Sequence, residues 1–425
     1  MKVYLESYGC TLNHGEARYM LDLLSVKGHE RVYEPDKADI NILFTCTVIK
    51  TTERSMLRRV QFFTNYDKPL IVSGCMAVIQ SGDIRKINPR AVFIQPKEIS
   101  KINELIEKIS DKAEVKIKPV SKEKRVKSKT GESIDSIIPI STGCRGQCTY
   151  CITRLARGTL SSYSVNEILS RATAAINHGL YEIRLTAQDT ACYGYNSTGN
   201  LAKLLTQLVG IDTEHDYRVR VGMMNPDSVK PILSELIESY KHKRIFKFLH
   251  VPVQTGSDEL LRAMGRKYTV SEFFFIIDKF RKSFPELTIS TDIIVGYPDE
   301  TEEQFQHSMN LLGRLRPNIV NITRFSARPG TPAAKLKNTN PGATIKARSR
   351  LMTKLRFKIS KELNDRTIGK KYKVLVTESV KAGSVLGRTD NYQPVVIKNA
   401  LALGSWVWVE VTDATDSYLV GEIVN

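Results

Sequence analysis

Three cysteines lie close together near the middle of the chain, in the segment STGCRGQCTYC. Cys144, Cys148 and Cys151 follow a Cys-x3-Cys-x2-Cys spacing, with Tyr150 before the last of them. Three thiolates at such short spacing can hold one cubane iron–sulfur cluster whose fourth iron has no protein ligand. That iron can bind the amino and carboxylate groups of S-adenosylmethionine (SAM), a combination that supplies radical chemistry. A zinc knuckle is the alternative, but zinc needs a nearby fourth ligand, and the next cysteine is Cys192.

Three further cysteines lie far apart in the N-terminal region, yet each follows a strand-like run. Cys10, Cys46 and Cys75 end the segments ESYGC, ILFTC and IVSGC. If these strands are parallel neighbours, their carboxyl ends meet at one edge of the sheet. Buried and inert cysteines are common, which would explain any one of the three alone. For all three together we expect a second three-thiolate cluster with an open iron, whereas Cys192 is interpreted as a small buried residue.

The sequence pattern of the first 110 residues predicts an α/β, Rossmann-like domain. Helical periodicity separates its strand-like runs, which are Val3–Ser7, Ile40–Thr45, Leu70–Ser73 and Ala91–Ile94. Residues 111–134 follow as a linker, because 111–130 alone hold seven lysines and one arginine without an aromatic residue.

Residues 135–362 repeat a strand followed by a helix. Amphipathic stretches such as 165–178 and 270–284 separate six strand candidates, at 136–141, 182–186, 218–222, 246–251, 288–295 and 319–325. Six such units predict a partial (β/α)6 barrel with its active site at the C-terminal ends of the strands.

The charge of the chain indicates a polyanionic partner. Lys and Arg total 63 against 45 Asp and Glu, a net charge of +18. Clustered cations bind phosphates by releasing counterions. Lys346, Arg350, Lys354 and Lys358 recur at every fourth position, which places them on one helical face above an apolar stripe. This face is equally consistent with a phosphate-binding track and with an ordinary solvated helix face.

Residues 363–425 change to short strands and turns, which predicts a small closed β-barrel. From Arg366 onward seven basic residues face six acidic ones, so this barrel is almost neutral. No apolar run of 18 residues occurs anywhere in the chain, which excludes a membrane span. The chain also opens on a strand pattern without a signal-peptide core, so we expect a cytoplasmic protein.

The whole chain resembles the radical-SAM methylthiotransferase family. The motifs that carry the resemblance occur in the family's order: SYGCTLNHGEA, ADINILFTCTV, IVSGCMA, STGCRGQCTYCITRLARG, HVPVQTGSD, TDIIVGYPDET, FSARPGTPAA and GRTDNY. The last resembles the signature of the TRAM β-barrel. LTAQDTACYG and VGMMNP are most similar to the archaeal and eukaryotic branch.

The resemblance implies an enzyme with two [4Fe–4S] clusters and SAM that acts on tRNA. Members of this branch act on N6-threonylcarbamoyladenosine beside the anticodon and replace its C2–H by a methylthio group. The six cysteines named above would be the cluster ligands and catalytic residues, and a flavodoxin- or ferredoxin-like protein would donate electrons. Alternatives are the related branches, which act on isopentenyladenosine in tRNA or on a ribosomal-protein aspartate. A further alternative is an RNA-binding protein with a structural cluster.

The resemblance also suggests residues that contact SAM and RNA. Tyr150, Gln188, Arg220, Asp292 and Gly296 are the SAM candidates. For these residues an ordinary barrel position or a tight turn remains an open alternative.

The RNA candidates lie in the C-terminal third of the chain. They are the four cations of the helical stripe, together with Arg388 and an exposed Tyr392 on the TRAM-like barrel, where charges and exposed aromatic rings would combine to hold RNA. Asp189 is a candidate for substrate recognition.

Overall fold

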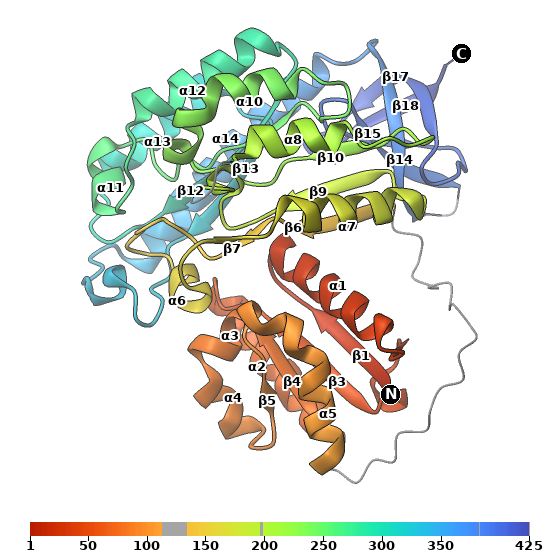
Figure 1. Cartoon of the computed structure of the whole chain (residues 1–425). Helices are drawn as coiled ribbons and strands as arrows, with labels where there is room; N and C mark the ends of the chain where they lie inside the picture. The colour runs from red at the N-terminus through yellow and green to blue at the C-terminus, as the bar shows by residue number, and fades with distance from the viewer. Residues whose placement is uncertain (113–133, 196–198, 382, 425) are drawn as a thin grey trace.

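The structure is a computed structural model that describes residues 1–112, 134–195, 199–381 and 383–424. An N-terminal α/β part, a central half-barrel and a C-terminal barrel follow one another along the chain (Figure 1). The predicted linker 111–134 falls, at positions 113–133, outside the described residues. No helix in the described part of the chain is long and apolar enough to span a bilayer.

The N-terminal part is a five-stranded parallel sheet in the order β2-β1-β3-β4-β5. Every residue of β3 and β4 is buried, as expected for central strands of a parallel sheet that is covered on both faces. The four predicted strands are present, and β2 is an edge strand that the sequence pattern did not predict. The elements are β1 (Lys2–Ser7), α1 (Thr11–Val26), β2 (Glu30–Val32), β3 (Ile40–Thr45), α2 (Lys50–Thr64), β4 (Leu70–Gly74), α3 (Cys75–Ile79), α4 (Ser81–Ile87), β5 (Val92–Phe93) and α5 (Ile102–Lys112).

The central part confirms the predicted partial barrel. Two three-stranded parallel sheets, β6-β9-β10 and β11-β12-β13, are joined by a parallel bridge between Val219 and Ile245. The predicted first strand divides into β6 and β7, of which β7 pairs with β8. The strands are β6 (Asp135–Pro139), β7 (Ser141–Thr142), β8 (Ser161–Ser162), β9 (Glu182–Thr186), β10 (Arg218–Arg220), β11 (Phe248–His250), β12 (Thr288–Val295) and β13 (Ile319–Arg324).

Helices cover the outside of the half-barrel and bury one continuous apolar core. Thr269 and Thr301 form capping boxes with Glu272 and Gln304, which define the starts of α12 and α13. The helices are α6 (Thr153–Arg157), α7 (Val165–Asn177), α8 (Leu201–Val209), α9 (Pro226–Val229), α10 (Leu233–Tyr240), α11 (Asp258–Ala263), α12 (Val270–Ser283), α13 (Glu302–Leu315) and α14 (Gly342–Asp365).

The C-terminal part is a closed five-stranded barrel in the order β14-β15-β16-β18-β17. Its strands are β14 (Lys371–Lys381), β15 (Ser384–Thr389), β16 (Pro394–Ile397), β17 (Trp406–Ala414) and β18 (Leu419–Ile423). It packs against the N-terminal ends of the half-barrel strands, where Phe246 and Phe248 join Leu375 and Tyr392 in one apolar cluster. The cysteine loop lies at the opposite end of the half-barrel strands. The half-barrel therefore separates the cysteine loop from the C-terminal barrel (Figure 1).

Candidate active site

Three neighbouring strands of the N-terminal sheet bring Cys10, Cys46 and Cys75 to one edge. Cys75 directly follows β4, Cys46 directly follows β3, and Cys10 follows β1 after a short turn. Because β1, β3 and β4 are parallel neighbours, their carboxyl ends lie together. Cys46 and Cys75 are buried and Cys10 is exposed, which leaves one side of the group open.

Glycines allow these loops to pack tightly. Gly74 has a φ of +83°, and a Cβ at this position would lie 2.2 Å from the Thr45 carbonyl oxygen. A Cβ on Gly9 would lie 2.6 Å from the Cβ of Cys46. Only glycine fits such approaches, so the sequence Gly-Cys at two of the strand ends is a packing requirement of the group.

Burial dominates the protonation of these thiols. It raises the pKa of Cys75 to about 11, partly offset by the nearby charge of Arg157. It also raises the pKa of Cys46, while Cys10 adds to the shift and Arg157 opposes it. Thiols with such values bind a metal centre with release of protons.

The second cysteine group occupies the loop after β7. The Cys144 thiolate position accepts a hydrogen bond from the Gly146 N–H at 3.2 Å. The loop is held at Thr149, whose N–H donates to the Met264 carbonyl and whose hydroxyl contacts that of Tyr297 at 2.9 Å. Local backbone bonds and one anchoring residue therefore define this loop.

Buried groups also surround the thiols of this loop. Burial raises the pKa of Cys144 to about 11 and also raises that of Cys148, where the charge of Arg266 acts in the opposite direction. Arg266 donates to the Tyr150 hydroxyl at 2.7 Å and to Asn225 Oδ1 at 3.0 Å. Tyr150 is thus fixed beside the cysteines by a half-buried cation.

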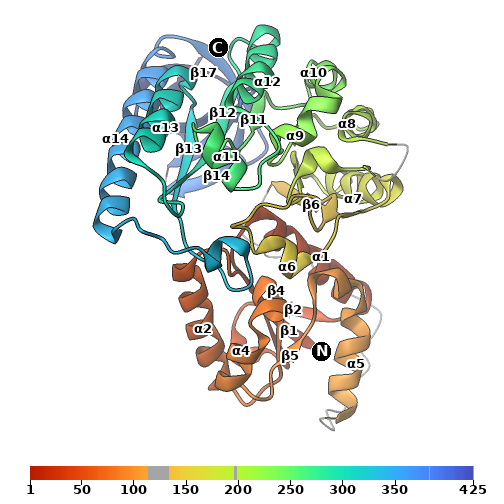
Figure 2. The ribbon, with the colours of Figure 1, turned by 90° about the vertical axis from the view of Figure 1, so that its left-hand side faces the viewer.

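A cysteine of each group lies beside the contact between the N-terminal part and the half-barrel. Helix α6, which begins two residues after Cys151, packs on α3, which begins at Cys75 (Figure 1). Figure 2 shows α6 between the N-terminal sheet and the half-barrel. Arg157 at the end of α6 forms a buried ion pair with Glu16 of α1. A second buried arginine, Arg328, binds the hydroxyl of Thr47, directly after Cys46, at 2.8 Å. It also pairs with Glu53 of α2.

The donor sets fit two iron–sulfur clusters. In the described residues no three His, Cys, Asp or Glu side chains are arranged to share one metal ion. Three thiolates of one group can each ligate a different iron of a cubane cluster. Each group offers three sulfurs, which leaves one coordination position for a substrate or cofactor atom.

The SAM candidates line the half-barrel at different depths. Gln188 follows β9 toward the cysteine loop, and its Oε1 is buried without a hydrogen-bond partner among the described residues. Asp292 accepts hydrogen bonds from Asn321 at 2.7 Å and faces His250 Nε2 at 3.0 Å. These contacts lower the pKa of Asp292 against the opposing effect of burial. A polar interior with a spare acceptor fits a charged, hydrogen-bonding cofactor.

Arg220 is the last residue of β10, in register with Arg184 in the middle of β9. Its guanidinium stacks on the rings of Phe248 and Tyr392, at 4.6 Å and 5.0 Å from their centroids. The Nε of Arg220 is buried and has no partner among the described residues. These contacts place Arg220 where the half-barrel packs against the C-terminal barrel. Its contact with SAM stays a prediction.

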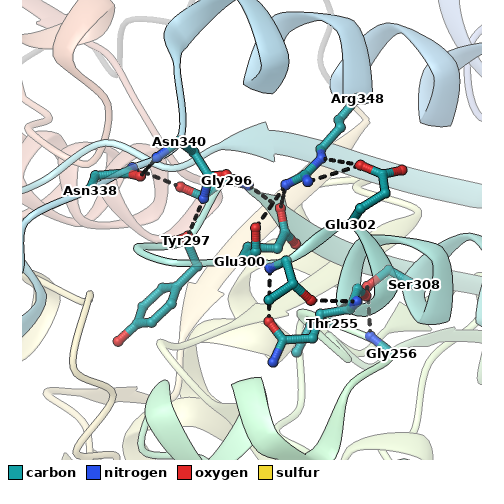
Figure 3. Close-up of polar contacts among 12 residues, drawn as sticks. Thr255, Gly256, Gly296, Tyr297, Glu300, Glu302, Ser308, Asn338, Asn340 and Arg348 are labelled. Atoms are coloured by element: carbon teal, nitrogen blue, oxygen red, sulfur yellow. Dashed lines mark hydrogen bonds and ion pairs between the residues drawn. The ribbon is translucent and has the colours of Figure 1, made fainter.

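Gly296 lies in a turn that connects several parts of the site (Figure 3). Its N–H donates to Glu300 at 2.8 Å, its carbonyl accepts from Asn338, and a Cβ here would collide with Ile345 of α14 at 2.6 Å. The next residue, Tyr297, reaches the Thr149 hydroxyl in the cysteine loop. Packing against α14 explains the glycine, and its predicted adenine contact is untested.

Asp189 is enclosed by donors. It accepts from the Asn225 N–H at 3.0 Å and from the Ser228 hydroxyl at 2.7 Å, and the Cys192 thiol lies 3.0 Å away. Burial raises the pKa of Asp189, and these hydrogen bonds oppose the shift. Cys192 is buried, as the sequence interpretation stated.

The predicted basic stripe lies on the exposed face of α14. Lys346, Arg350, Lys354 and Lys358 are all exposed, whereas Met352 and Ile359 of the same helix are buried. On the inner face Arg348 bonds to Glu302 Oε2 at 2.9 Å and to the Glu300 carbonyl at 3.0 Å (Figure 3). The helix is therefore anchored on one side and presents its cations on the other.

The expectation that Tyr392 is an exposed aromatic residue is wrong. It is only 8% exposed, its hydroxyl donates to Glu182 Oε1 at 2.7 Å, and its ring packs on Phe246 and Phe248. Docking of the C-terminal barrel on the half-barrel covers the ring. Arg388 stacks on the same ring, 4.9 Å from its centroid, and pairs with Glu378.

The exposed aromatic residues of this barrel are Trp408 and Tyr418, at 52% and 40% exposure. The sequence reading missed them, although the alternation in SWVWVEV places Trp408 on the face opposite the buried Val409.

The sequence reading also missed three arginines near the cysteine groups: Arg157 and Arg328, which are buried, and Arg266, which is half-buried. Each is spaced like an ordinary surface cation, so the sequence alone offers no signal for its burial. The segments LARG and SARPG that hold two of them were noted only as parts of longer motifs.

Family models match three stretches of the chain. Residues 2–95 match the uncharacterized protein family UPF0004, residues 138–312 the radical SAM superfamily and residues 365–424 the TRAM domain. Among solved structures, the chain is similar to the radical S-adenosylmethionine methyltransferase TsrM from Kitasatospora setae. The TM-score is 0.59 at 11% identity, over 89% of this chain and 79% of that one. This likeness shows the fold.

Curated relatives match along the whole chain. A probable threonylcarbamoyladenosine tRNA methylthiotransferase of Pyrococcus abyssi is 42% identical, with both chains covered completely. The threonylcarbamoyladenosine tRNA methylthiotransferase of Drosophila melanogaster is 34% identical over all of this chain and 78% of its own length.

Proposed function

The chain belongs to the threonylcarbamoyladenosine tRNA methylthiotransferase family, and from this premise we propose its reaction. It is a transferase that converts N6-threonylcarbamoyladenosine beside the anticodon of tRNA into the 2-methylthio derivative. One structural observation supports the proposal: α6, which follows one three-cysteine group, packs on α3, which begins at a cysteine of the other group. A protein with a single structural cluster would not need this pairing.

The reaction explains why radical chemistry is needed. An aromatic C–H bond at C2 of adenine is not acidic enough for a side-chain base to remove its proton at neutral pH. A [4Fe–4S] cluster with SAM supplies radical chemistry at such a bond when both are bound. Cys144, Cys148 and Cys151 would hold this cluster, and Arg266 would fix Tyr150 beside them.

The chain's other residues bind and orient. Cys10, Cys46 and Cys75 would hold the second cluster on the opposite side of the same contact. Gln188 and Asp292 would offer polar groups to SAM inside the half-barrel. Reduction requires an electron from outside, and we propose a flavodoxin- or ferredoxin-like protein as the donor.

The tRNA would contact the exposed cations of α14. Lys346, Arg350, Lys354 and Lys358 are spaced at four residues along one face, which suits contacts to a phosphate backbone without base readout. Trp408 and Tyr418 offer exposed rings on the C-terminal barrel, where bases can stack. Arg388 lies partly buried nearby, and Tyr392 supports the barrel from within.

Nucleoside mass spectrometry tests this function. tRNA that carries threonylcarbamoyladenosine is incubated without oxygen with cluster-reconstituted protein, SAM and a reductant. We expect one methylthio group to be added to that nucleoside, and a Cys10→Ala variant should not add it. Formation of 5′-deoxyadenosine with an unchanged nucleoside would retain the radical-SAM assignment and reject this substrate. Transfer to isopentenyladenosine, or to a protein after ribonuclease treatment, would favour the related branches.

A further inference from the structure

Arg157 belongs by sequence to the radical-SAM region but contacts the cysteine group of the N-terminal sheet. It ends α6, six residues after Cys151, and its side chain is only 1% exposed. One guanidinium nitrogen donates to Glu16 Oε1 and another donates to Asn13 Oδ1 at 2.6 Å. The charge of the guanidinium also acts on the Cys75 thiol, where it opposes the rise in pKa that burial causes.

Asn13 extends these contacts to the other two cysteine loops. Its side-chain nitrogen donates to the Tyr8 carbonyl at 2.7 Å and to the Thr45 carbonyl at 2.9 Å. Tyr8 lies two residues before Cys10, and Thr45 directly precedes Cys46. Arg157 is therefore linked through the Asn13 amide to the loops of Cys10 and Cys46. It also ends α6, which packs on α3, the helix that begins at Cys75.

The charge of Arg157 matters because its surroundings are negative once a cluster is bound. The buried Glu16 carboxylate pairs with this guanidinium, whose charge also acts on the thiols of Cys46 and Cys75. A nearby cation stabilises the more negative, reduced form of an iron–sulfur cluster, as do hydrogen bonds to its sulfurs. Glu16 acts in the opposite direction.

We propose that Arg157 is a positioning residue for the N-terminal cluster: it orders the three cysteine loops and raises the reduction potential of the cluster they hold. The inference rests on the proposed function only in that these cysteines hold a cluster. It means that the half-barrel, through α6, completes a site that the N-terminal sheet does not complete alone.

Redox titration monitored by electron paramagnetic resonance tests the proposal in the full-length protein. A background in which Cys144, Cys148 and Cys151 are all replaced by Ala isolates the N-terminal cluster. In this background we expect Arg157→Gln to shift the midpoint potential to more negative values and Glu16→Gln to shift it to more positive values. A purely structural role would not produce opposite shifts, and an unchanged potential in both variants would overturn the proposal.

Activity measurements with all six cysteines present complete the test. Arg157→Gln should lower the methylthiolated product by about tenfold or more while 5′-deoxyadenosine formation from SAM continues. Arg157→Lys keeps the charge but not the forked donor geometry, so we expect a potential close to wild type with a smaller loss of product. If Arg157→Gln does not fold, the Lys variant decides: full product and full iron content would reject the positioning role.

Arg328→Gln is the matched control. Arg328 is an equally buried arginine at the same contact, but it binds Thr47 and Glu53. It should leave the potential of the N-terminal cluster unchanged, and an equal shift in both variants would show a general effect of the contact. If wild-type protein adds no methylthio group while the potentials shift as expected, the proposed function fails and the role of Arg157 stands.

Discussion

The two cysteine groups of this protein are built in opposite ways. Cys144, Cys148 and Cys151 lie in one loop after a single strand, whereas Cys10, Cys46 and Cys75 come from three strands of a sheet. The loop is held by local hydrogen bonds and by Thr149, and the sheet group by register and by Arg157 from another part of the chain. The geometry of the cysteine loop depends mainly on the spacing of its cysteines along the chain. The geometry of the sheet group depends on the strand register and on the packing that aligns three strands.

The largest expected effect separates the roles of the two groups. Cys148→Ala should abolish both 5′-deoxyadenosine formation and methylthio transfer, because the site for SAM is lost. Cys75→Ala should abolish only the transfer and leave SAM cleavage in place. Liquid chromatography of both products measures this. Cys192→Ala, at a buried cysteine outside both groups, should retain both activities. Methylthio transfer by Cys75→Ala would show that the two cysteine groups do not have separate roles in SAM cleavage and methylthio transfer.

A backbone change tests how strongly the assembled group depends on packing. In Gly74→Ala the new Cβ would meet the Thr45 carbonyl at a position with φ of +83°, so β4 and its cysteine must shift. We expect the iron content of reconstituted protein to fall by about half, with SAM cleavage retained. Gly82→Ala is the control, because a Cβ there meets nothing within 4 Å. Full iron content in Gly74→Ala would mean that the sheet group tolerates misalignment.

Charge reversal on α14 should affect neither cysteine group. Lys354→Glu combined with Lys358→Glu should weaken tRNA binding by about tenfold at moderate salt and flatten its salt dependence. Fluorescence anisotropy with labelled tRNA measures the affinity. The same reversal at Lys279 and Lys282 on α12 changes the net charge equally and should have a smaller effect. Equal losses in both pairs would assign the binding to net charge rather than to the stripe.

The smallest expected effect concerns the far end of the half-barrel. Tyr392→Phe removes the hydrogen bond to Glu182 and should lower the free energy of unfolding by about 1 kcal/mol, measured by urea denaturation. Because the ring is buried, the affinity for tRNA should stay unchanged. Tyr418→Phe is the control at an exposed ring. A clear loss of tRNA affinity in Tyr392→Phe would instead support a direct contact between Tyr392 and RNA.

Much of the fold could be predicted because local patterns specify it. Strand-like apolar runs marked β1, β3, β9, β12 and the strands of the C-terminal barrel, and period-3.6 patterns marked α7, α12 and α14. The edge strand β2 was missed because three residues carry too little pattern. The prediction for Tyr392 was wrong because the local sequence of a turn does not show whether its aromatic residue is exposed to solvent or buried against another domain.

The sequence alone determined the Cys-x3-Cys-x2-Cys loop, the strand-end positions of the other cysteines and the cationic face of α14, since each depends on neighbours within a few residues. Tertiary structure decided which strands lie side by side, that α6 packs on α3, and that Arg157 and Arg328 are buried where the half-barrel contacts the N-terminal part. Arg157 and Glu16 are 141 residues apart. Burial of an ion pair at that separation depends on how the parts of the chain dock, which no local pattern encodes.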